Sequence, residues 1–482
     1  MIAFPYLPLA RWPCCHVSSR PLDKRLIVRR CKACQRRKIK CSGTTPCAYC
    51  FRTNQVCDRA SNSVHQQPRH GAVVFAPPQS GATALKPNSG FMREKPIRHL
   101  EPWSDPDDQF VAHFFSTFLT VNDLTGRSWR GLDSHLNDLL RNSSALRDVA
   151  IALAALDSSR MPHSTKKWEG GVTLKKRALT SYSRAIRDIK GLLASPAQLG
   201  ESWESATWVT FFLGIFELML ETSEGNWEKH FLYGTSHLLR LKGPKNCTEG
   251  PGKELFLTLR IFEISRALIY TDSSFLCEPN WVRLAQTLRD GVGDAWHPKE
   301  AIYDLMLCCS NLCIKALQYT QKPDPRDPFV GLSLATEGAR FRQCLSEWYQ
   351  RAQLRSFSQQ PLLKNVELLL SLIYYSALSI YLSGIYDYQP SSFPLPTTSL
   401  PTLSRYQVEE HLSSIIKLTN LALKETNLMG LLFLFPLRVA AARAKTAEDQ
   451  AQVLELFQRV RKKGFAILEV FEVEVCRLWE AY

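Results

Sequence analysis

The chain has 482 residues, of which 60 are Lys or Arg and 45 are Asp or Glu, so its formal net charge is +15. This length leaves room for several domains. Residues 24–59 hold eleven basic residues and one acid, Asp58, whereas residues 106–482 carry only about +2. This distribution argues against a nucleic-acid surface spread along the whole chain and directs attention to residues 24–59.

Residues 1–23 contain a short apolar run without a charged start. Pro5 and Pro8 interrupt it. The run is a poor match to an export signal and is too short to span a membrane. We expect a disordered leader over residues 1–23.

Six cysteines follow, in two copies of the spacing C-x2-C-x6-C. They are Cys31, Cys34, Cys41, Cys47, Cys50 and Cys57. Zinc needs four ligands in a tetrahedron, and the thiolates of a C-x2-C pair can reach one ion. Two zinc ions need eight ligand positions, so six thiolates suffice only if two of them bridge both ions. The spacing predicts a compact cluster with two Zn²⁺ within residues 24–59.

The first half of this module is the basic half. The helix expected after its second cysteine carries four cations, namely Arg36, Arg37, Lys38 and Lys40. The matching stretch of the second half has only Arg52. Two zinc ions and six thiolates together remove two charges, so the module keeps about +8, which suits a phosphate backbone. We expect the first half to face DNA, with binding that weakens steeply as salt rises.

The stretch from Cys31 to Cys57, with Pro46 directly before the fourth cysteine, resembles the fungal Zn2Cys6 binuclear cluster family of transcription regulators. The resemblance implies that Cys31 and Cys47 are the bridging thiolates. It assigns the other ligands to two zinc sites, Cys34 and Cys41 at one and Cys50 and Cys57 at the other. It also implies a short helix in the major groove of DNA.

The same resemblance implies how DNA is read. Lys38, with Arg37 beside it, would contact the guanines of a CGG-type triplet. Guanine offers two acceptors in the major groove, and a Lys or Arg donor there gives roughly 1–3 kcal/mol of discrimination. The residues expected to hold phosphates are Arg36, Lys40 and Arg52. Gln35 departs from the basic residue often found at its position in the family.

Other interpretations of the cysteines explain less. A disulfide-bonded secreted module needs an export signal, and none is visible. An iron–sulfur cluster uses four cysteines at other spacings and leaves the basic helix unexplained. The alternative function is a zinc-module scaffold or ligand-sensing protein that contacts proteins rather than DNA, against which the concentrated charge argues. The basic run also suits a nuclear import signal, and we expect a nuclear protein.

Residues 60–105 have the composition of a flexible linker, with six prolines among Ser, Gly, Gln and Asn. No heptad pattern of apolar residues is sustained there. A coiled-coil dimer beside the cluster is therefore not expected. Monomeric DNA binding and a homodimer through the distal domain both remain open.

Residues 106–482 are predicted to form a large all-α regulatory domain of packed helix pairs. Apolar residues recur at three- and four-residue steps over 107–119, 146–156, 174–193, 203–220, 227–241, 253–270, 300–319, 366–386, 408–423 and 450–479. Asp105 and Pro106 indicate a helix start. Stop signals are read at Gly243–Pro244 and at Pro279–Asn280.

Trp227, His230 and Gly234 resemble the W-x2-H-x2-G helix of the fungal-specific transcription factor domain, over about residues 106–300, except that Gly234 comes one residue later than in that pattern. This implies a regulatory helical domain, which in some members senses small molecules or dimerises. His230 and His237 fall on one helical face, but we interpret them as core or surface residues rather than ligands.

Further patterns in the helical region have ordinary interpretations. The apolar stretches 208–220 and 366–385 are interpreted as core helices, so no membrane is expected as a partner. Cys308, Cys309 and Cys313 are expected to be reduced thiols, with a redox sensor as the open alternative. No nucleotide-binding or hydrolase motif is present, so we expect no enzyme.

The sequence therefore predicts a zinc-dependent regulator of RNA polymerase II transcription. The expected partners are double-stranded promoter DNA and the transcription machinery or its co-regulators. A fungal biosynthetic gene cluster or a nutrient pathway would fit as the target.

Overall fold

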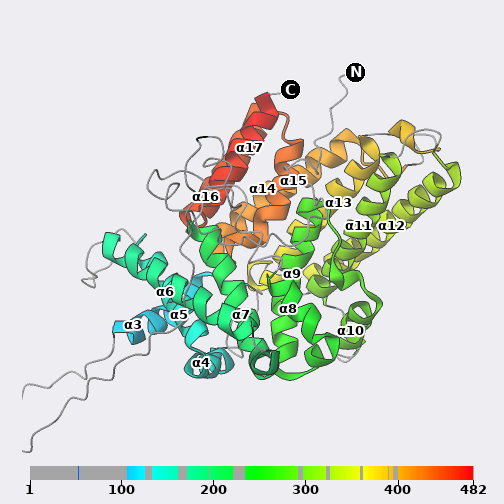
Figure 1. The fold of residues 1–482 in the computed structure, drawn as a ribbon. Helices are drawn as coiled ribbons and strands as arrows, with labels where there is room; N and C mark the ends of the chain where they lie inside the picture. Colours follow the sequence, from blue (N-terminus) through cyan, green and yellow to red (C-terminus); the bar gives the residue numbers. More distant parts are fainter. Residues whose placement is uncertain are drawn as a thin grey trace, which may run out of the picture. The chain divides into compact units, whose positions relative to one another are not determined.

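The computed structural model describes residues 106–124, 133–160, 171–194, 196–220, 234–290, 297–321, 326–358, 362–388, 390–394 and 400–480, together with Thr53. Within these ranges the protein is all-α (Figure 1). The only β pairing among the described residues is one isolated bridge. The prediction of a large helical domain is confirmed.

The first helices pack around α5. They are α3 Pro106–His113, the π-helix η1 Phe114–Leu119, α4 Asp133–Asn142, α5 Ser144–Ser158, α6 Gly171–Leu193 and α7 Pro196–Leu220. Ser143 caps α5 by accepting a hydrogen bond from the Leu146 amide at 3.3 Å. Residues 149–158 are all buried, and small alanines among them let α3, α6 and α7 approach closely. A helix that is apolar on all sides belongs in the core of such a bundle.

Six described helices follow in the central part of the domain, of which α11 and α12 pack against α13. They are α8 Thr235–Lys242, α9 Gly250–Tyr270, α10 Pro279–Asp290, α11 Pro298–Thr320, α12 Pro328–Ser358 and α13 Val366–Asp387. Figure 1 shows α11, α12 and α13 side by side, and each contacts the other two. Within the described ranges, α13 is the one helix long and apolar enough to cross a membrane, but 78% of its apolar window is buried inside the protein. This burial fits the core helix expected for residues 366–385.

The last helices are α14 Arg405–Glu425, α15 Leu434–Arg443, α16 Ala447–Lys462 and α17 Leu468–Glu480. Residues of this last part of the chain form backbone hydrogen bonds with residues of the first part. Asp123 pairs with Leu428 in a parallel bridge: its amide donates to Asn427 O at 2.7 Å, and its carbonyl accepts from the Met429 amide at 2.9 Å. The Ile467 amide donates to Leu218 O at 3.2 Å. The start and the end of the helical region are therefore joined by backbone hydrogen bonds.

Two boundary predictions were wrong. Residues 450–479 form two helices instead of one, because Gly464 has a φ of +104° and ends α16. Pro279 is the first residue of α10 instead of a stop, since proline is well suited to the first helical position. The start at Pro106 and the stop before Gly243 were correct.

The prediction missed four helices, α4, α10, α12 and α15. The longest, α12, contains Gly331 and Gly338, which weaken its helical pattern. Both glycines lie where a Cβ atom would overlap a tyrosine hydroxyl, of Tyr319 and Tyr386 respectively. These glycines therefore allow α12 to pack closely against α11 and α13.

Candidate functional site

Apart from Thr53, the predicted zinc module lies outside the described residues. This applies to all six cysteines and to the five predicted DNA contacts, so the zinc and DNA sites remain predictions. His230 also lies outside them, while His237 is exposed on α8. Within the parts of the chain that the structure describes, no three His, Cys, Asp or Glu residues are grouped to hold a metal ion.

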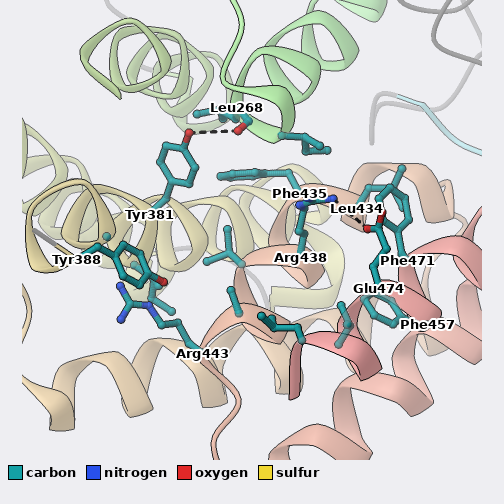
Figure 2. Close-up of a pocket in the computed structure, with 17 residues that line it drawn as sticks. Leu268, Tyr381, Tyr388, Leu434, Phe435, Arg438, Arg443, Phe457, Phe471 and Glu474 are labelled. Carbon is teal, nitrogen blue, oxygen red and sulfur yellow. Dashed lines mark hydrogen bonds and ion pairs between the residues drawn. The ribbon is translucent and has the colours of Figure 1, made fainter. Parts of the chain in front are cut away.

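The described domain contains a cavity of about 80 Å³ bounded by five helices (Figure 2). Its walls come from the last turn of α9, the second half of α13, one face of α15, and residues of α16 and α17. The lining is mostly aliphatic and aromatic and includes Leu268, Ile380, Phe435, Phe457 and Val475. The cavity is thus an apolar chamber inside the C-terminal part of the domain.

Helix α15 supplies most of the polar character of this chamber. Its cavity-facing residues recur at three- and four-residue steps, as expected for one helical face, and are Leu434, Phe435, Arg438, Val439, Ala442 and Arg443. One stripe of α15 therefore presents two arginines within an otherwise apolar surface.

Arg438 faces Glu474 of α17 across the cavity (Figure 2). Its Nη1 atom lies 3.6 Å from Glu474 Oε2, and its guanidinium lies 5.8 Å from the centre of the Phe471 ring. Burial lowers the pKa of Arg438, and the Glu474 carboxylate acts in the opposite direction. An arginine nevertheless stays protonated. Arg438 is therefore a half-buried cation that lies close to the Glu474 carboxylate.

Arg443 has a different setting at the other side of the cavity. Its Nη2 donates to both carboxylate oxygens of Asp387, at 2.9 and 2.8 Å. The guanidinium also stacks 4.8 Å from the centre of the Tyr388 ring (Figure 2). These contacts fix Arg443 in place.

Tyr381 forms part of the apolar wall. Its hydroxyl lies 3.1 Å from Leu268 O and 3.3 Å from Cys313 Sγ, and its ring meets Phe435 edge to face. Burial raises the pKa of Tyr381 well above its usual value. The hydroxyl connects α13 to the end of α9 and stays neutral.

The cysteine cluster on α11 does not have the environment of a redox sensor. Cys309 and Cys313 are buried, and burial raises the pKa of Cys313 to about 11. The Cys308 side chain is exposed, but desolvation of its thiol and the nearby Asp304 raise its pKa to about 11 as well. Reactive cysteines need a lowered pKa, so the structure favours the expected reduced thiols.

Sequence reasoning missed the cavity. Its lining residues are spread from Leu268 to Leu478, and no local spacing connects them. The sequence of α15 did contain a local signal of the cavity, because Arg438 interrupts an apolar helical face there.

Comparisons with known proteins indicate the family of the described domain. The family model named fungal specific transcription factor domain matches residues 109–481, a wider range than the predicted resemblance over residues 106–300. An uncharacterised protein of Emericella nidulans is 34% identical over 124 residues, which are 25% of each chain. An aurofusarin cluster transcription factor of Gibberella zeae is 62% identical over 29 residues, 6% of this chain and 4% of the relative.

The chain spans a quarter or less of the length of these curated relatives. No solved structure matches. The family model, in contrast, covers more than three quarters of the chain, including every described helix except the first residues of α3. The chain therefore belongs to the family of the fungal specific transcription factor domain.

Proposed function

We propose that this protein is a nuclear, zinc-dependent transcription regulator that binds DNA sequence-specifically through residues 24–59. The observation that carries the proposal is the repeated C-x2-C-x6-C spacing with its basic helix, upstream of a domain from a transcription factor family. The similarity of a short segment to an aurofusarin cluster transcription factor supports the same class.

The proposed mechanism separates positioning from sequence reading. Thiolates are the donors that zinc prefers, and six of them fit a two-zinc cluster with Cys31 and Cys47 as bridges. Phosphate contacts by Arg36, Lys40 and Arg52 would set the orientation of the module without selecting a sequence. Lys38 and Arg37 would then reach the guanines of a CGG-like triplet.

The test is selection of random duplex DNA by the zinc-loaded full chain, with Lys38→Ala beside Lys86→Ala as a charge-matched linker control. We expect enrichment of a CGG-like triplet by the natural chain and by Lys86→Ala. Lys38→Ala should retain both zinc ions and lose sequence preference, at a cost of roughly 1–3 kcal/mol. A zinc-loaded chain without any enrichment would favour the protein-contacting alternative.

The bridging assignment has its own test. Cys47→Ala should release both zinc ions, because a bridge serves both sites and metal binding is coupled to folding. Cys50→Ala, which alters a ligand of one site only, is the matched comparison. Measured zinc content decides: one tightly held zinc in Cys47→Ala contradicts the assignment.

A further inference from the structure

The size of the cavity limits what it can hold. A water molecule needs roughly 10–15 Å³ by the same kind of measure, so about 80 Å³ has room for on the order of five to eight water-sized groups. That is the size of a single aromatic ring with a short substituent. The cavity therefore suits a small organic molecule rather than a peptide or a large cofactor.

The deep part of the cavity is lined by aromatic rings. Phe435, Phe457 and Phe471 are buried and come from α15, α16 and α17 respectively. The Tyr381 ring meets Phe435 edge to face, with the ring centres 5.6 Å apart, and its hydroxyl lies 3.1 Å from its hydrogen-bond acceptor Leu268 O. Aromatic rings favour edge-to-face and offset contacts with a further ring. The walls therefore suit a planar apolar occupant.

The three charged residues of the lining already have partners (Figure 2). Arg443 donates to both carboxylate oxygens of Asp387, at 2.9 and 2.8 Å. Arg438 and Glu474 form an ion pair in which Nη1 and Oε2 are 3.6 Å apart. A charged ligand would have to compete with these partners and would also lose its own hydration. The cavity therefore favours an uncharged ligand.

Water is a poor occupant of this space. A buried water needs roughly two to four polar partners, whereas Leu434, Val439, Val475 and Leu478 have no hydrogen-bonding side chain. An unfilled cavity, in turn, loses the dispersion contacts that its walls could make. An apolar molecule restores these contacts without leaving a polar group of its own unsatisfied.

We propose that this cavity binds a small uncharged aromatic molecule, with its ring among the side chains of Phe435, Phe457 and Phe471. Such a ligand contacts helices that are distant in sequence and stabilises their packing by mass action. The site depends neither on the zinc module nor on DNA binding.

The test uses the purified, zinc-loaded full chain with benzene and toluene as probes, each titrated by calorimetry and by thermal unfolding at neutral pH. Benzoate and benzylamine are the controls, because they carry the same ring with a negative and a positive charge. We expect both probes to bind one site per chain with a Kd of about 0.1–1 mM and to raise the unfolding temperature. Both charged controls should bind at least about tenfold more weakly.

Two variants that fill the cavity locate the site. Ala442→Leu places a larger side chain on the α15 wall and should weaken toluene binding at least about tenfold. Ala451→Leu is the matched control, since Ala451 is exposed on α16 and does not line the cavity, and it should change affinity less than about twofold. Val475→Leu fills the cavity from α17 and should weaken binding at least about threefold. Far-UV circular dichroism checks folding, and Val475→Leu gives a result even if Ala442→Leu does not fold.

A third variant tests whether charge takes part. Glu474→Gln removes the carboxylate with almost no change in side-chain volume. Because an uncharged ligand does not use this group, toluene affinity should change less than about threefold.

Several results would overturn the proposal. These are the absence of binding by both probes, binding of benzoate or benzylamine as tight as that of toluene, and natural affinity in the folded cavity-filling variants. A loss in Ala451→Leu or Glu474→Gln as large as that in Ala442→Leu would overturn it as well.

Discussion

Arg266 is a buried arginine and Arg438 a half-buried one, and their surroundings differ. Arg266 on α9 donates to Glu263 at 3.0 and 2.8 Å, to Asp272 at 2.6 Å and to Ser273 O at 2.7 Å. Burial alone would lower the pKa of Arg266, but these partners outweigh that effect and raise it. Arg438 on α15 faces a cavity and a carboxylate 3.6 Å away, and its pKa is lowered.

This difference between Arg266 and Arg438 indicates which of the two charges stabilises the fold of the domain. A fully hydrogen-bonded buried ion pair is destabilising to break, because the remaining charge is left without compensation. Glu263 also accepts hydrogen bonds from Ser236 and Ser274, so its network connects α8, α9 and the following loop. Arg438 lines the cavity and lies 3.6 Å from Glu474.

The largest expected effect is at the complete network. Glu263→Gln removes the charge that compensates Arg266 and should cost about 3–5 kcal/mol of unfolding free energy. Urea unfolding followed by circular dichroism measures it. Glu254→Gln is the control, because Glu254 is exposed on the same helix and its loss should cost less than about 0.5 kcal/mol. Equal losses of unfolding free energy in the two variants would show that the hydrogen-bond network of Glu263 contributes little to stability.

A third arginine, the half-buried Arg342, extends the comparison to pH. Arg342 donates to Ser379 O at 3.1 Å and to Pro401 O at 2.9 Å, and burial lowers its pKa to about 10. Burial first, and the nearby Arg342 second, lower the pKa of His411 to about 4. His411 therefore remains neutral in the folded protein at a pH where it is protonated in the unfolded chain.

This histidine predicts a loss of stability in acid. As pH falls from about 6.5 toward about 4, the unfolded chain gains a proton that the folded protein does not, so the folded state loses on the order of 1–3 kcal/mol. His411→Gln should remove this part of the pH dependence, measured as urea midpoints against pH. His237→Gln, at an exposed site on α8, should retain it. Identical pH profiles for the natural chain and His411→Gln would contradict the assignment.

The smallest effect is expected at the cavity. Arg438→Met replaces a desolvated cation with an apolar side chain, and Glu474 is exposed enough to be hydrated. Unfolding free energy should change by less than about 1 kcal/mol, by the same urea measurement. A loss as large as that of Glu263→Gln would place both arginines in the same structural role.

Helices such as α5 and α13 could be predicted from the sequence, but α12 and the cavity could not. α13 was recognisable because it is a long apolar segment, and α5 because its apolar residues recur at helical steps. α12 was missed because Gly331 and Gly338 serve tertiary packing, which local patterns do not reveal. The cavity was missed because it forms only when five separate helices meet.

The predicted zinc module stands in contrast to the cavity. Its evidence is entirely local, six cysteines at fixed spacing within 27 residues, so it can be read without a fold. Its ligands lie outside the described residues and remain a prediction, to be decided by zinc content and DNA selection.

The bridge between Asp123 and Leu428 has a consequence for synthesis in the cell. The backbone partners of Asp123 are translated about 300 residues after it, and those of Leu218 about 250 residues after it. At a translation rate of roughly 5–20 residues per second, on the order of 15–60 s pass between synthesis of the first helices and synthesis of the segment that completes their hydrogen bonds. During that interval the apolar surfaces of the first helices must be kept from aggregating, so this domain should depend on chaperones while it emerges from the ribosome.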